Sequence, residues 1–179
     1  EVAAKGLSEG ECDGLLIETA QDLLQAKAAV NGSRAAIKNA GRDIYLMAQV
    51  TVEATGTMLL GSEIGAALTA LEPLGIDSIG LNCATGPTEM SEHLRQLSQQ
   101  TEIAITCMPN AGLPVLGANG AHYPLSPIDL AKALKVFIDD YGLNFIGGCC
   151  GTTPEHLKEV VAIANLEKPM VREIPVEAS

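Results

Sequence analysis

Three of the five cysteines follow segments that read as buried strands. Cys83 comes directly after the apolar segment 78–82, and Cys149 and Cys150 follow the segment 143–146. The carboxyl ends of parallel strands lie at one edge of a sheet, so we expect these three thiols to converge. Three thiolates without a fourth protein ligand are typical of catalytic zinc, which keeps one position open for water or substrate. Gly148 and Gly151 flank the cysteine pair and give its backbone the freedom to place both sulfurs on one metal.

The spacing alone leaves a second interpretation open, because buried free cysteines often serve only as small apolar side chains. Cys12 and Cys107 fit that interpretation better, since one lies in a polar connector and the other inside a strand. A histidine ligand is not expected. His93 and His156 are predicted on solvated helix faces, and His122 falls in a long loop.

Other polar residues also lie near predicted strand ends. Glu18 closes the first apolar run, and Asn110 follows Pro109 after the fourth. Each has a plain structural explanation, as a solvated acid and as a turn residue. The loop Thr55-Gly56-Thr57 could hydrogen-bond a carboxylate, although such loops are common.

Alternating strands and helices must position these residues. The predicted strands are 14–19, 44–52, 78–82, 102–108 and 143–146, and helices are predicted at 20–39, 63–71, 88–99, near 128–141 and at 153–165, after an orphan helix at 1–9. Thr153 as N-cap and Pro154 at the first helical position mark the start of the last helix. Five strand–helix units with apolar strands predict a parallel sheet, either doubly wound or part of a (β/α) barrel. The sequence has no glycine-rich nucleotide fingerprint after a strand, so nucleotide binding has no support.

Composition narrows the class of protein. The chain has 179 residues, 47% of them apolar and 18% charged, which is rich enough for a packed core. Its net charge of −11 argues against nucleic acid and anionic membranes as main partners. The sequence shows neither a signal peptide nor an apolar run long enough to cross a bilayer. The odd cysteine count then predicts reduced thiols and a cytoplasmic location.

Three motifs resemble the homocysteine S-methyltransferase family. They are GLNCATGP at 80–87, MPNAGLP at 108–114 and GGCCGTTPEH at 147–156, and LIET at 16–19 fits the same pattern. The resemblance runs from about Gly14 to Ala164. Within the family it is strongest to the homocysteine-binding module of the cobalamin-dependent enzymes, whose linker toward a pterin-binding module resembles the segment EIPV at 173–176.

The resemblance implies a (β/α)8 barrel in which Cys83, Cys149 and Cys150 hold Zn²⁺. It also implies that Glu18 binds the amino group of homocysteine and that the Asn110 amide oxygen occupies the open metal position before substrate arrives. Zinc would remove the proton of the homocysteine thiol, whose free pKa is ~8.5, and keep the sulfur nucleophilic in a complex with four thiolates. That sulfur would take a methyl group from methylcobalamin, ultimately from 5-methyltetrahydrofolate, to give methionine. Methylcobalamin and the pterin would be bound by other modules of the same enzyme.

Five strand–helix units are fewer than the eight of the family barrel. We therefore expect residues 1–166 to form the C-terminal part of a TIM barrel and residues 167–179 to form a linker. The missing N-terminal half of the barrel would then be a partner of this chain. Alone, the chain should be poorly stable and nearly inactive, because an open sheet exposes its interior face and two edges. Three other interpretations stay open: a methyltransferase that uses betaine or S-methylmethionine, a non-catalytic zinc-binding half-barrel, and a plain α/β chain whose cysteines only pack.

Overall fold

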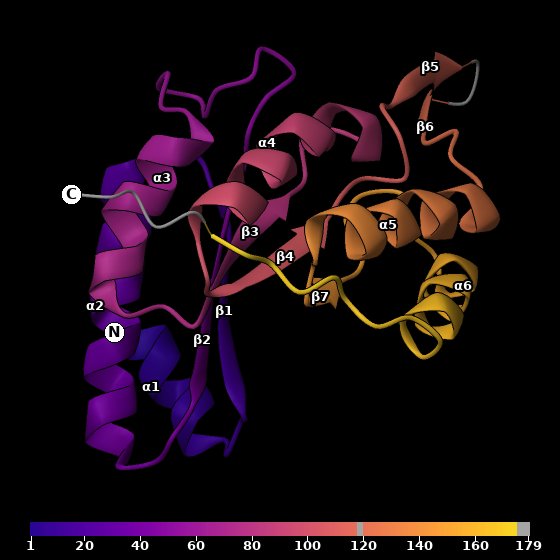
Figure 1. Cartoon of the computed structure of the whole chain (residues 1–179). Helices are drawn as coiled ribbons and strands as arrows, with labels where there is room; N and C mark the ends of the chain where they lie inside the picture. The colour runs from indigo at the N-terminus through magenta and orange to yellow at the C-terminus, as the bar shows by residue number, and fades with distance from the viewer. Residues whose placement is uncertain (118–119, 175–179) are drawn as a thin grey trace.

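Five parallel strands form the main sheet in a computed structural model that describes residues 1–117 and 120–174 (Figure 1). The strands are β1 (Gly14–Ala20), β2 (Tyr45–Val50), β3 (Ser78–Asn82), β4 (Ala104–Met108) and β7 (Phe145–Ile146). The helices are α1 (Val2–Glu9), α2 (Leu23–Ala40), α3 (Ile64–Leu71), the short 3₁₀ helix η1 (Glu72–Leu74), α4 (Pro87–Gln100), α5 (Pro127–Tyr141) and α6 (Pro154–Ala164). The predicted α/β class with five strand–helix units is therefore confirmed.

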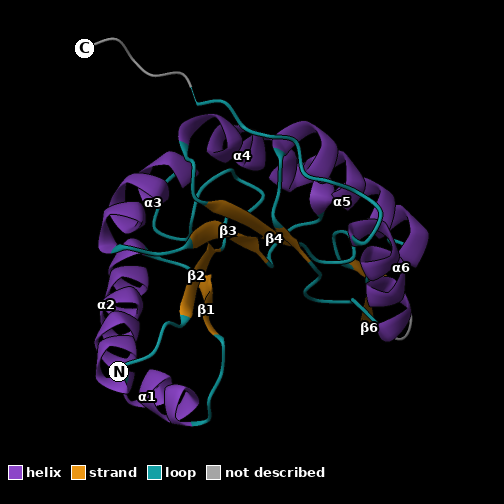
Figure 2. Cartoon of the chain, turned by 60° about the horizontal axis from the view of Figure 1, so that its bottom comes forward, coloured by secondary structure: helices purple, strands orange, loops and turns teal. Residues whose placement is uncertain are grey.

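The strand order separates the two folds that the sequence left open. The strands lie side by side in chain order, β1-β2-β3-β4-β7, and every neighbouring pair is parallel. Right-handed crossovers between strands in this order place all the connecting helices on one face of the sheet. Figure 2 shows the helices as an arc outside the strands, with the other face of the sheet bare. A doubly wound sheet needs a reversal of strand order, so the winding is that of a barrel.

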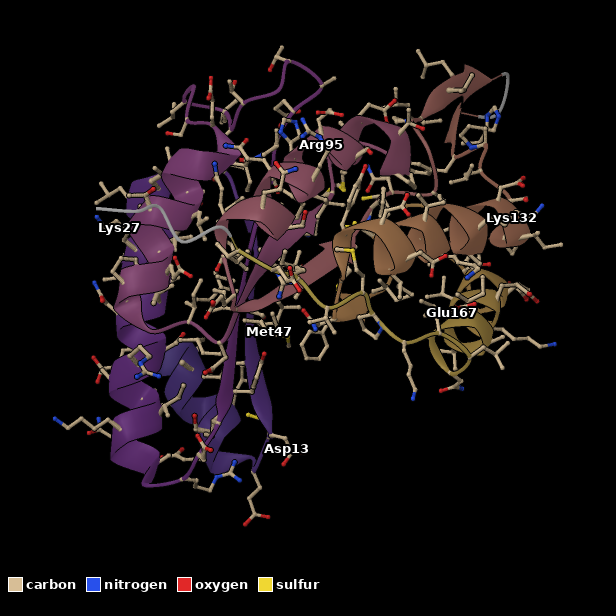
Figure 3. All side chains as sticks on the ribbon, viewed as in Figure 1. Asp13, Lys27, Met47, Arg95, Lys132 and Glu167 are labelled. Atoms are coloured by element: carbon tan, nitrogen blue, oxygen red, sulfur yellow. The ribbon has the colours of Figure 1, made fainter. Side chains whose placement is uncertain are left out.

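The core lies between the sheet and the helices. The strand side chains that face the helices are apolar and fully buried, among them Leu46, Val50, Ile79, Leu81 and Ile105. Each helix contributes a matching apolar stripe, and its charged side chains point to solvent, as the labelled Lys27, Arg95 and Lys132 do (Figure 3). Burial of these two apolar layers is the main stabilising contribution to the fold.

The face of the sheet opposite the helices is its concave face (Figure 2). A row of polar side chains crosses it. The side-chain amide of Gln49 on β2 donates to Oγ1 of Thr106 on β4 at 2.8 Å, across Gly80 on β3. A Cβ at position 80 would collide with the backbone oxygen and side chain of Thr106. The strand sequences are therefore not uniformly apolar, because successive side chains point alternately toward the helices and toward the concave face.

The same concave face also exposes large apolar side chains. The rings of Tyr45 and Phe145 lie 5.7 Å apart, and each side chain is more than one-third exposed, as is Leu16 on β1. This agrees with the expectation that one face of the sheet is open. Among the described residues, no helix is long and apolar enough to cross a membrane.

Two segments differ from the sequence-based expectation. The long loop after β4 contains a small antiparallel hairpin, β5 (Val115–Gly117) and β6 (Gly120–His122). The predicted linker is attached to the barrel, since Arg172 donates to the backbone oxygens of Thr101 and Ile103 at 3.2 and 2.8 Å. Residues 175–179 lie outside the described part of the chain, and the domain boundary at 166 stays a prediction.

Replacing Gly80 with alanine should lower the free energy of unfolding by about 1–3 kcal/mol, because the new methyl group overlaps Thr106 in a packed row. Urea unfolding followed by circular dichroism measures the change. Gly6→Ala in α1 is the matched control, since nothing lies within 4 Å of a Cβ there and alanine favours the helix. Equal stability of the two variants would contradict the crowding of the concave face.

Candidate metal centre

Three sulfur atoms meet at the carboxyl edge of the sheet. The Sγ atoms of Cys83, Cys149 and Cys150 all lie within 4.8 Å of one another. The Cys83–Cys150 separation is 3.7 Å and the Cys149–Cys150 separation is 4.0 Å. Two thiolates on one tetrahedral zinc with bonds of about 2.3 Å would have sulfurs roughly 3.8 Å apart. The donor set and its spacing thus fit one zinc ion with a fourth position open.

Two segments of the chain carry the sulfurs, and we call them the arms of the cluster. The Cys83 arm directly follows β3, and its backbone is strained. Cys83 and Ala84 both adopt left-handed conformations, with φ of +63° and +59°, which residues other than glycine adopt uncommonly. The N–H of Cys83 donates to the oxygen of Met108 at 3.2 Å, and the N–H of Thr85 donates back to the Cys83 oxygen at 2.7 Å. These bonds turn the chain sharply at the sulfur-bearing residue.

The Cys149–Cys150 arm follows β7 and is held by the segment after β4. The N–H of Cys149 donates to the Pro109 oxygen at 2.7 Å, and the N–H of Ala111 donates to the Cys150 oxygen at 2.9 Å. Between them, the N–H of Cys150 donates to Oδ1 of the buried Asn110 at 3.0 Å. Asn110 therefore lies beside the cluster, and its predicted role as a metal ligand before substrate arrives stays a prediction.

Tyr123, which follows β6, closes one side of the cysteine pair. Its ring occupies the space that a Cβ on Gly151 would need, and Gly151 has φ of +78°. The interaction of its hydroxyl with the Cys150 sulfur is the main cause that raises the pKa of Tyr123. Sequence reasoning missed this neighbour, because it does not predict the hairpin that positions Tyr123.

The Cys149 thiol favours its protonated form when no cation is bound. Burial, followed by the neighbouring sulfurs of Cys83 and Cys150, raises the pKa of Cys149 to about 12. Thiolates are the form that binds zinc, so metal binding has to displace protons.

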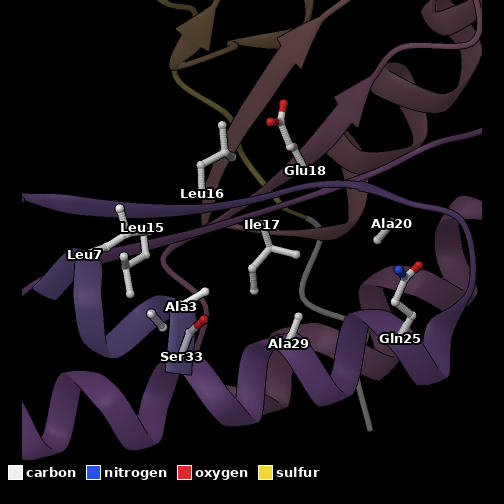
Figure 4. Close-up of a pocket in the computed structure, with 11 residues that line it drawn as sticks. Ala3, Leu7, Leu15, Leu16, Ile17, Glu18, Ala20, Gln25, Ala29 and Ser33 are labelled. Atoms are coloured by element: carbon white, nitrogen blue, oxygen red, sulfur yellow. The ribbon is translucent and has the colours of Figure 1, made fainter. Parts of the chain in front are cut away.

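Glu18 lies on the concave side of β1. In Figure 4, Leu16 and Glu18 point away from α2, whereas Ile17 and Ala20 lie on the helix side of the strand. The pocket drawn there, between α1, α2 and β1, is lined mainly by apolar and small side chains. The carboxylate of Glu18 is thus available to the face of the sheet whose carboxyl edge carries the cysteines.

Two further residues that the sequence analysis considered, His156 and Cys107, are buried. His156 was predicted on a solvated helix face, and this is wrong: its side chain is buried, with Nδ1 accepting from the N–H of Thr153 at 3.2 Å and Nε2 2.9 Å from the Leu125 oxygen. It caps α6, whose predicted start at Thr153 and Pro154 is confirmed. Cys107 is fully buried in the core, as expected of a packing residue.

The Thr55-Gly56-Thr57 loop forms an internal turn, and His93 and His122 are separate from the cysteine cluster. In the loop, the backbone N–H of Gly56 donates to the backbone oxygen of Glu53 at 2.9 Å, and the backbone N–H of Glu53 donates to the backbone oxygen of Thr57 at 2.9 Å. The described part of the chain offers no histidine, aspartate or glutamate to this cluster of three sulfurs. The predicted carboxylate contact of the loop stays a prediction.

The chain is similar in sequence to known proteins over most of its length. The sequence pattern of the family described as homocysteine S-methyltransferase matches residues 1–164. The chain is 64% identical over 178 residues to a methionine synthase of Mycobacterium tuberculosis and 65% identical over 160 residues to one of Mycobacterium leprae. These alignments cover 99% and 89% of the chain, which spans only 15% and 13% of the two relatives.

Solved structures share the fold. The apo form of the homocysteine methyltransferase MmuM from Escherichia coli matches with a TM-score of 0.64 at 18% identity, over 90% of this chain and 56% of that one. Its metallated form matches with a TM-score of 0.52 at 18% identity, over 79% and 52%. At such identity the likeness supports the fold alone.

Wild-type protein should carry about one zinc per chain, and Cys149→Ser should lose it, because a serine hydroxyl cannot replace a thiolate donor. Elemental analysis after dialysis against zinc measures the content. Cys12→Ser, which removes a thiol outside the cluster, should keep the metal. Equal zinc in the wild type and in Cys149→Ser would exclude the cluster as a metal site.

Zinc affinity should rise with pH. The pKa of Cys149 lies at about 12 without a cation, so a proton leaves on binding, and the association constant should increase about tenfold or more per pH unit between pH 6 and 8. Competition with a chelator of known protonation constants provides the measurement. A pH-independent affinity would show that the metal does not displace thiol protons.

Proposed function

The chain belongs to the homocysteine S-methyltransferase family, and from this premise we propose that it carries the zinc and homocysteine site of an enzyme that methylates homocysteine to methionine. The observation that carries the proposal is the convergence of the Cys83, Cys149 and Cys150 sulfurs at one edge of a barrel-type sheet. The closed ligand set of a structural zinc needs a fourth protein donor, which the described cluster lacks. The fourth position is therefore available to a substrate thiol.

The chain's own residues divide the tasks of the site. The three cysteines hold the metal, and the segment Pro109–Ala111 holds the cysteine pair through the hydrogen bonds described above. Zinc, when bound, supplies a cation that takes up the homocysteine sulfur as a thiolate at neutral pH. Glu18 supplies a carboxylate on the concave face, where it would bind the ammonium group of the same substrate.

Methylcobalamin is the methyl donor that we propose. Identities of 64% and 65% to two methionine synthases support it over betaine or S-methylmethionine. Sites for the cobalamin and for the folate that remethylates it would lie on other modules. Initial rates of methionine formation by the zinc-loaded protein with homocysteine and each donor in turn test the choice. All rates should be low because the sheet of the barrel is open, and the rate with methylcobalamin should exceed the rates with betaine and S-methylmethionine.

Homocysteine binding is the direct test of the proposed site. Cobalt(II) in place of zinc should show a stronger sulfur-to-metal charge-transfer absorption when L-homocysteine adds a fourth thiolate, and homoserine, with oxygen in place of sulfur, should leave the spectrum unchanged. A spectrum that does not respond to L-homocysteine would refute the proposed substrate.

Glu18→Gln should weaken L-homocysteine binding while zinc stays in place. Loss of a charged hydrogen bond costs about 1.5–3 kcal/mol, which corresponds to roughly tenfold weaker binding or more. Isothermal titration of the zinc-loaded protein gives the dissociation constant. Glu102→Gln, an exposed acid at the opposite end of the sheet, is the matched control and should bind as the wild type does.

A further inference from the structure

The edge strand β1 contains an irregularity next to Glu18. Its pairing with β2 runs regularly from Gly14 to Ile17, then shifts, so that Ala20 pairs with Val50. Thr19, inside the shift, has a left-handed backbone with φ of +56°. A β-branched residue in this region is a genuine outlier, and bulges next to active sites often redirect a side chain.

Asn82 at the end of β3 holds this conformation. Its side chain is 1% exposed and reaches past the end of β2 to Thr19. Oδ1 accepts from the backbone N–H of Thr19 at 2.8 Å, and Nδ2 donates to the Thr19 hydroxyl at 2.8 Å. One buried amide thus binds both the backbone N–H and the hydroxyl of a strained residue on a strand that does not neighbour its own.

Asn82 is also attached to the cysteine cluster. It immediately precedes Cys83, and its Nδ2 lies 3.9 Å from the sulfur of Cys149. Its backbone oxygen accepts from the hydroxyl of Thr51 at 3.2 Å, which ties the end of β2 to the same point. The bulge beside Glu18 and Cys149 therefore share the buried side chain of Asn82, and Cys83 is the next residue in the chain.

We propose that Asn82 is a positioning residue for homocysteine recognition. It keeps Thr19 left-handed, and the bulge so formed presents the Glu18 carboxylate on the concave face in register with the sulfur cluster. The inference rests on the proposed function, since it concerns how the substrate's amino group and sulfur are held at a fixed separation. It assigns the strained backbone of Thr19 to substrate binding rather than to stability.

The test uses the zinc-loaded protein with L-homocysteine as titrant. Asn82→Ala should raise the dissociation constant roughly 10–100-fold, the usual effect of removing a residue that orients groups at a metal site. Adding Thr19→Gly to Asn82→Ala should restore most of the lost affinity for homocysteine, because glycine adopts a positive φ without the hydrogen bonds that Asn82 supplies. A role in general stability predicts the opposite, since the added glycine loosens the chain further.

A second pair of variants leaves Asn82 and the cysteines untouched and carries the test if Asn82→Ala loses zinc or fails to fold. Thr19→Val removes the hydroxyl and keeps the strain, so it should weaken homocysteine binding, whereas Thr19→Gly should bind nearly as the wild type does. Asn144→Ala removes a similar side-chain hydrogen bond at the opposite end of the sheet, where Oδ1 of Asn144 accepts from the N–H of Ile105 at 2.9 Å. It should lower the melting temperature without changing homocysteine affinity.

The outcomes separate this inference from the proposed function. A wild-type protein that takes up zinc but does not bind L-homocysteine would overturn both. A wild type that binds L-homocysteine, together with equal affinities for Thr19→Val and Thr19→Gly, would overturn the positioning role of Asn82 alone. The same holds if Asn82→Ala folds and binds as the wild type does.

Discussion

The carboxyl end of β4 is the part of the structure on which the cysteine cluster depends. β4 lies between β3 and β7 and gives no sulfur to the cluster. Its backbone and the residues after it nevertheless bind both arms, through the Met108 oxygen on one side and the Pro109 oxygen, Asn110 side chain and Ala111 N–H on the other. The three sulfurs converge because two crossovers of the same hand bring their strands to either side of this one segment.

This dependence explains which parts of the site the sequence could predict. Cys83, Cys149 and Cys150 were assigned to one edge because parallel strands share their carboxyl side, and that rule needs only the order of the elements. The same rule places Glu18 near the end of its strand, and its role in substrate binding stays a prediction. The fold class followed from the alternation of apolar and helical segments, although the choice between a barrel and a doubly wound sheet required either the family motifs or the observed strand order.

The parts that the sequence could not predict depend on contacts between distant segments. The burial of His156 is fixed by the oxygen of Leu125, 31 positions earlier, and no local pattern reports such a partner. The hairpin of β5 and β6 has strands of three residues each, too short for a periodic signal. Thr19 goes against its own propensity, and the hydrogen bonds to its left-handed backbone and its hydroxyl come from the amide of Asn82, 63 positions away.

The electrostatics of the cluster follow from the same geometry. Burial and both neighbouring sulfurs act in one direction on Cys149, raising its pKa to about 12. Cys149 can therefore lie within 4.8 Å of the other two sulfurs as a neutral thiol, which avoids the repulsion that a third thiolate would bring. A divalent cation then supplies the attraction that stabilises the ionised form, and a soft ion is favoured because sulfur donates to it strongly. The backbone bonds around β4 position the sulfurs before the charge forms, so that metal binding needs proton release and little rearrangement of the chain.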